Sequence, residues 1–78
     1  MSGDRLSMDR EPAARLAELC LRQSRELDSL VAEIEQRGDP ADLQDAKKIV
    51  GRIMGEMYVA ALYPIFDRYP ELKPEGFP

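Results

Sequence analysis

The chain has no histidine or tryptophan, and Cys20 is the only cysteine among its 78 residues. One cysteine excludes a disulfide within the chain, and with no histidine it also excludes the usual zinc-binding sets. A nucleophile at Cys20 would lack the histidine that most often acts as its base. No nucleotide motif is visible either, so we expect no catalytic residue, no metal and no cofactor.

Long uncharged runs are also scarce. The longest, residues 57–66, is about half of the roughly 20 residues that a membrane-crossing helix needs. The first eleven residues contain no apolar stretch of the kind that marks a secretory signal. We therefore expect no membrane partner and a cytoplasmic location, where a lone thiol stays reduced.

Positive charge is in the minority. The chain carries 11 basic and 15 acidic side chains, for a net charge of −4. Proteins that hold a phosphate backbone do so with clustered Lys and Arg, so the acidic balance disfavours nucleic acid as a partner.

The pattern of apolar residues predicts a first helix over residues 10–37. Asp9 is a suitable N-cap, because its side chain can accept a bond from a free amide of the first turn. Pro12 fits that turn, where a proline removes no helical hydrogen bond. The apolar positions recur at spacings typical of one helical face. This predicted seam consists of Leu16, Cys20, Gln23, Leu27, Leu30 and Ile34.

A very short turn follows the first helix. Gly38 can adopt the left-handed conformation that ends a helix, and Asp39-Pro40 is a typical cap followed by a first-turn proline. Two long helices joined this closely must lie side by side. The sequence therefore predicts an all-α, antiparallel two-helix hairpin.

Proline marks the end of the second helix, which we expect over about 40–63. Pro64 has no amide hydrogen and would clash with the carbonyl of Ala60, so the helix should end or kink there. A short turn over 65–69 would complete a hairpin that spans 9–69. We expect residues 1–8 to be disordered and residues 70–78, with three prolines, to form an extended tail.

The end of the second helix is apolar on all sides. Residues 57–63 contain no charge, and one neighbouring helix cannot cover such a segment. A chain this small also has little core of its own, which favours oligomerisation. We therefore predict a homodimeric four-helix bundle, with a further protein partner as the alternative. The predicted interface residues are Gln23, Gly51, Met54, Gly55, Met57, Tyr58, Val59, Leu62, Tyr63 and Phe66.

Two of these residues form a Gly-x-x-x-Gly pair. Gly51 and Gly55 share one face of the helix, where another backbone can approach closely. The alternative is that ordinary packing tolerates them. Gln23, a polar residue within the apolar seam, would fix the register of an interface or would lie at its edge.

These features favour a non-enzymatic protein that acts through protein–protein contacts, as a homo-oligomer, adaptor or regulator. One alternative is a helical dimer that binds RNA or DNA and resembles ROP-type hairpins. A second is a small enzyme, because Leu21-Arg22, Leu27-Asp28 and Arg37 resemble the first helix of all-helical chorismate mutases. That resemblance implies three helices around a pocket ringed by Arg and Lys, whereas this chain has no room for the third helix.

Overall fold

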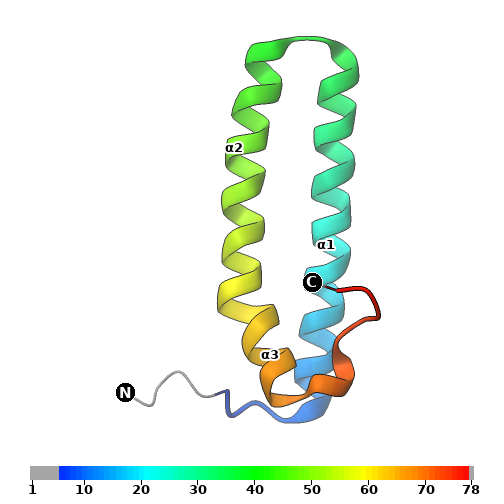
Figure 1. The fold of residues 1–78 in the computed structure, drawn as a ribbon, viewed down its shortest axis with the longest axis vertical. Helices are drawn as coiled ribbons and strands as arrows, with labels where there is room; N and C mark the ends of the chain where they lie inside the picture. Colours follow the sequence, from blue (N-terminus) through cyan, green and yellow to red (C-terminus); the bar gives the residue numbers. More distant parts are fainter. Residues whose placement is uncertain (1–5, 78) are drawn as a thin grey trace.

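All regular structure in residues 6–77, the part described by the computed structural model, is helical. The elements are α1 (Arg10–Arg37), α2 (Pro40–Met57), the π-helical segment η2 (Tyr58–Leu62), α3 (Tyr63–Arg68) and the 3₁₀ turn η3 (Pro70–Leu72). Helices α1 and α2 lie antiparallel and side by side (Figure 1), in a molecule that measures 44 × 28 × 19 Å. The predicted all-α hairpin is confirmed. The disorder predicted for residues 1–8 falls mostly outside the described residues.

The turn forms from the residues that predicted it. Gly38 has a φ of 89° and its N–H donates to the carbonyl of Glu35 at 3.2 Å. The carboxylate of Asp39 accepts from the N–H groups of Ala41 at 3.0 Å and Asp42 at 3.4 Å, and so caps α2. At the start of α1 the side-chain cap predicted for Asp9 is absent. Only the Asp9 carbonyl is used, accepting from the Ala13 N–H at 3.1 Å.

The core lies at the open end of the hairpin, away from the turn. Small residues of α1 face large residues from η2 and α3, so the two helical rods pack closely there. Leu62 is fully buried, with an exposed fraction of 0%. The core consists of Ala13, Ala17, Cys20, Leu62, Ile65 and Phe66.

The face that α1 turns inward differs from the predicted seam. Ala13, Ala17 and Ser24 are buried, whereas Leu16, Gln23 and Leu30 of the seam are exposed. The seam prediction was therefore wrong for Leu16, Gln23 and Leu30. It assumed that the largest side chains face the partner helix, but close packing against Leu62 and Phe66 selects small residues instead.

The second helix continues past the predicted end without a break. The N–H of Tyr63 bonds to the carbonyl of Tyr58, five residues back, which makes one wide π turn before Pro64. A π turn holds one extra residue, so it shifts the face of everything after it by about 100°. That shift brings Leu62 and Phe66 onto the same inward face as Val50.

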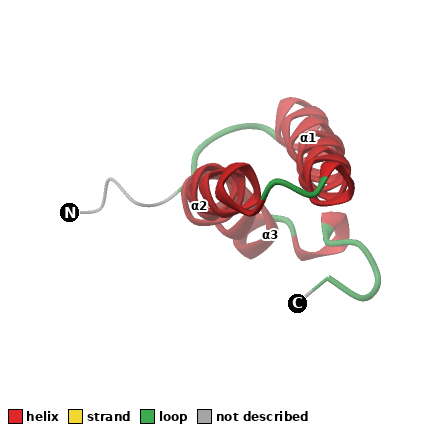
Figure 2. Cartoon of the chain, turned by 90° about the horizontal axis from the view of Figure 1, so that it is seen from above, coloured by secondary structure: helices red, strands yellow, loops and turns green. Residues whose placement is uncertain are grey.

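The two ends of the chain close the open end of the hairpin. The Tyr69 hydroxyl donates to the carbonyl of Met8 at 2.8 Å, and Arg10 pairs with Glu71 at 2.9 Å. The tail, predicted to be extended, turns back instead. Phe77 lies 5.1 Å from the Phe66 ring and 5.5 Å from the Tyr58 ring, measured between centroids. Figure 2 shows the tail on one side of the layer that α1 and α2 form.

Candidate interaction surfaces

Large apolar side chains remain on the outside of the hairpin. Those of α1 lie along one flank of the helix and are 37–46% exposed, and Ile49 of α2 is 59% exposed. We call the resulting surface the α1–α2 face. It consists of Leu16, Leu19, Gln23 and Leu30 on α1 with Ile49 and Ile53 on α2.

These positions lie on the same side of the molecule. In an α-helix each residue is rotated by about 100° from the one before it. By this count, the exposed apolar positions of α1 are rotated by about 90° from the positions of α1 that face α2. Ile49 and Ile53 are rotated by about the same angle, and in the same sense, from the positions of α2 that face α1. In an antiparallel pair, equal rotations in the same sense lead to the same side of the layer. Tyr58 is rotated in the opposite sense and so lies on the other side of the layer. Because Phe77 packs against Tyr58, the tail covers that other side and leaves the α1–α2 face bare.

Gln23 is the polar residue of this face. Its side chain is exposed between Leu19 and Leu30, so it does not line the contact between α1 and α2. Within the described part of the chain the Gln23 side chain therefore lies on the outer surface, and its role in an interface stays a prediction.

Most of the other predicted interface residues gather on α2 and beyond it. They line a shallow apolar groove with a volume of about 420 Å³. We call this the glycine groove. It is formed by Gly51, Met54, Gly55, Tyr58, Val59 and Tyr63.

The two glycines of the groove have no role in packing the hairpin. A Cβ added to Gly51 or Gly55 would meet nothing within 4 Å, so no part of the described chain requires their small size. A glycine inside a helix costs about 1 kcal/mol relative to alanine. Close packing within the described chain therefore does not explain the pair, and the approach of another molecule stays a prediction.

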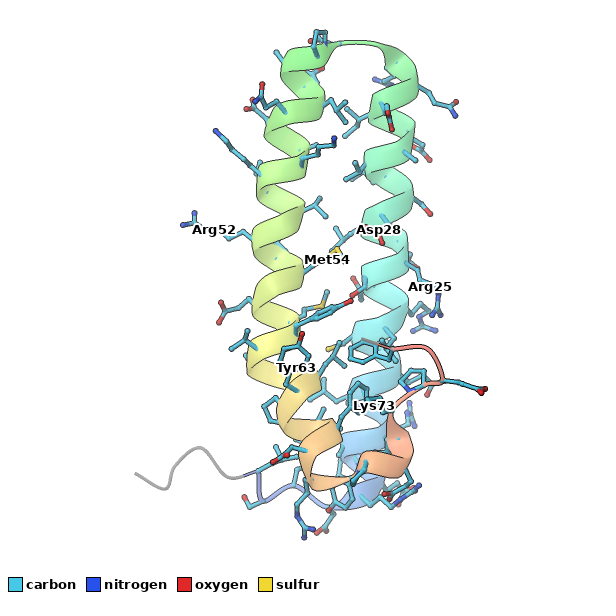
Figure 3. All side chains as sticks on the ribbon, in the orientation of Figure 1. Arg25, Asp28, Arg52, Met54, Tyr63 and Lys73 are labelled. Carbon is cyan, nitrogen blue, oxygen red and sulfur yellow. The ribbon has the colours of Figure 1, made fainter. Side chains whose placement is uncertain are left out.

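The groove presents both depressions and projections. Val59 is 67% exposed and Tyr63 is 49% exposed, while the glycines four and eight residues before Val59 leave the backbone open. Tyr58 and Tyr63 are in edge-to-face contact, 5.7 Å apart, which fixes one wall of the groove. In Figure 3, Tyr63 lies at the lower part of the second helix, and Arg52 points away from α1.

Three predicted interface residues lie inside the hairpin. Leu62 and Phe66 belong to the core, and Met57 packs against it. Leu62 and Phe66 therefore offer almost no surface to a partner, whereas Met57 is partly exposed. The prediction assumed that one neighbouring helix could not cover a segment that is apolar on all sides, but the tail also packs against this core.

The one thiol is a packing residue. Cys20 is buried beside Ala17, and burial raises the pKa of its thiol above the ordinary value. A raised pKa leaves less of the reactive thiolate at neutral pH. Four residues on, the Ser24 hydroxyl is buried with no hydrogen-bond partner among residues 6–77.

The helix that runs on from α2 through α3, which we call the second rod, is long and apolar enough to span a membrane by length and composition alone. The continuous helix Pro40–Arg68 contains an 18-residue window with a mean hydropathy of 1.3, of which 22% is buried. The prediction from sequence missed this window because it considered only the charge-free residues 57–66. The absence of a membrane partner stays a prediction.

Within residues 6–77, no three His, Cys, Asp or Glu side chains come together as a metal site. Comparison with protein families, with curated proteins and with solved structures finds no match for the chain.

Proposed function

We propose that the chain is a non-enzymatic protein that self-assembles, with two hairpins packing through their α1–α2 faces into a four-helix bundle. The observation that carries this proposal is the row of exposed leucines and isoleucines on one side of the hairpin. Contiguous apolar surface of this kind is typical of a protein–protein interface.

A second copy fits this face in size and chemistry. The long dimensions of the hairpin, 44 × 28 Å, have room for the roughly 800 Å² per subunit that a standard stable interface buries. Two helices packed on two helices also give the commonest small bundle. Gln23 would lie within the interface, where two amides can bond to each other and set the register.

The same face is less suited to lipid. Gln23 lies among its leucines, and Arg52 and Glu56 interrupt the apolar window of the second rod. Charged groups are costly in the hydrocarbon core of a bilayer, whereas a protein interface accepts them at its rim. We extend the proposal to a cytoplasmic protein on the same grounds.

Sedimentation velocity of purified Leu30→Asp tests the proposal. A carboxylate within an apolar interface stays unpaired, so this variant should lose the α1–α2 contact and sediment as a smaller assembly than the parent. Ser29→Asp is the matched control, because it adds the same charge one residue away on an exposed side of α1. It should sediment like the parent.

The proposal is wrong if the parent chain is monomeric at every concentration, or if the Leu30→Asp variant has an unchanged mass. Flotation with vesicles of zwitterionic lipid gives a further test. If the parent floats with the vesicles and Leu30→Asp does not, the face binds lipid and not a second copy.

A further inference from the structure

We infer that the glycine groove is a second interface between copies, in which the second rods of two hairpins cross antiparallel at Gly55. The inference rests on the proposed self-assembly only in that the partner is again this chain. The α1–α2 face and the groove lie on different sides of α2, so a molecule can use both at once.

The groove is complementary to itself. In an antiparallel crossing centred on Gly55, a residue that comes before Gly55 in one copy lies opposite the residue that comes equally far after Gly55 in the second copy. Val59 of one copy then lies over Gly51 of the second copy, and the reverse. The most exposed apolar side chain of the groove thus fits where the partner has no side chain.

Charge selects the antiparallel direction. Arg52 and Glu56 lie on the same edge of the groove, one turn apart. In the antiparallel crossing, Arg52 of one copy falls within about 3 Å along the axis of Glu56 of the second copy, because each residue rises about 1.5 Å. Two opposite-charge pairs form. In a parallel crossing this edge of one copy and the same edge of the second copy lie on opposite sides of the contact, so neither pair forms.

The tail leaves the two glycines open. Phe77 packs against Tyr58, one wall of the groove, and against Phe66, while Gly51 and Gly55 remain exposed. Figure 1 shows the tail beside α1 and the length of α2 free of it. A second helix centred on Gly55 can therefore approach the backbone that the two glycines leave open.

Gly55→Leu tests the crossing, read by sedimentation velocity together with Leu30→Asp. The leucine fills open space in the single chain, so the hairpin should keep its helical circular dichroism. With both interfaces present, the parent forms assemblies of at least four chains. Each single variant should form dimers, and the double variant should be monomeric. Ser29→Leu, which adds a leucine on α1 away from the groove, should behave like the parent.

The two single variants separate the two proposals. A monomeric Leu30→Asp variant overturns the groove interface and leaves the α1–α2 dimer standing. A monomeric Gly55→Leu variant does the reverse. If the parent never exceeds a dimer and Gly55→Leu leaves that dimer intact, the groove interface is also wrong.

Charge reversal then tests the direction of the crossing. In the Leu30→Asp background, Arg52→Glu should weaken the remaining dimer by about tenfold, because both pairs become repulsive. Adding Glu56→Arg should restore it. If the swap does not rescue the dimer while helicity is unchanged, the helices do not cross antiparallel.

Discussion

Tyr69 joins two parts of the chain that are 61 residues apart in sequence. Its hydroxyl donates to the Met8 carbonyl in a partly buried setting, where the bond has little competition from water. The neighbouring Arg10–Glu71 pair has both side chains more than half exposed. The Arg10 hydrogen bond lowers the pKa of Glu71, but exposed ion pairs of this kind contribute little to stability.

We therefore predict that Tyr69→Phe lowers the free energy of unfolding by about 1 kcal/mol, the usual value of one hydrogen bond. Urea unfolding followed by circular dichroism measures this. The matched control is Tyr63→Phe, since Tyr63 is half exposed and its hydroxyl makes no hydrogen bond to residues 6–77. Equal stability of the two variants would show that the Tyr69 bond adds nothing.

Residue types near the turn were enough to predict the hairpin. Gly38 and Asp39 act through bonds within their own few residues, so the end of α1 and the start of α2 follow from local sequence. The roles of Leu16 and Leu30 did not follow. Their exposure depends on which side chains arrive opposite them, and the apolar stripe of α1 is broader than one neighbouring helix can cover.

The main surprise at the level of elements is the π turn before Pro64. An α-helix at this point would place the ring of Pro64 against the Ala60 carbonyl, and the wider turn relieves that clash. The same extra residue rotates Leu62 and Phe66 into the core. Sequence periodicity assumes one constant angle per residue, so it could not locate these core positions.

Removal of Ala60, an exposed residue of η2, should turn the segment into a regular α-helix with the same downstream face. On its own this deletion leaves Pro64 in a regular helix, and we predict a loss of about 3 kcal/mol. Combined with Pro64→Ala, it should recover to within about 1 kcal/mol of the parent in urea unfolding. A lone deletion as stable as the parent would show that η2 does not serve the proline.

The whole molecule is unevenly packed. Its fully buried residues lie at the open end, whereas the half next to the turn buries Val50 and otherwise packs partly buried apolar residues, such as Val31 and Ile34 on α1 and Leu43 and Ala46 on α2. Near Val59 the chain itself covers Leu62 and leaves Val59 exposed, and the partner predicted for this segment stays a prediction.

We predict that the dependence of hydrogen exchange on concentration is strongest in the turn half. If copies pack through the α1–α2 face, amides in 27–46 should exchange more slowly as concentration rises, because assembly adds to their stability. Amides in 13–20 should change much less, because the chain already buries that region. Mass spectrometry at two concentrations measures both. Exchange in 27–46 that ignores concentration would argue against assembly.

The joining of the two chain ends at the foot of the hairpin also sets how the molecule responds to tension. The blue segment that begins the described chain and the red tail that ends it both lie in the half opposite the turn (Figure 1). A pull between them acts across the rods, and so it opens contacts one after another, beginning with the Tyr69–Met8 bond. The hairpin would unzip from its best-packed end, and the Gly38 turn would be the last part to open.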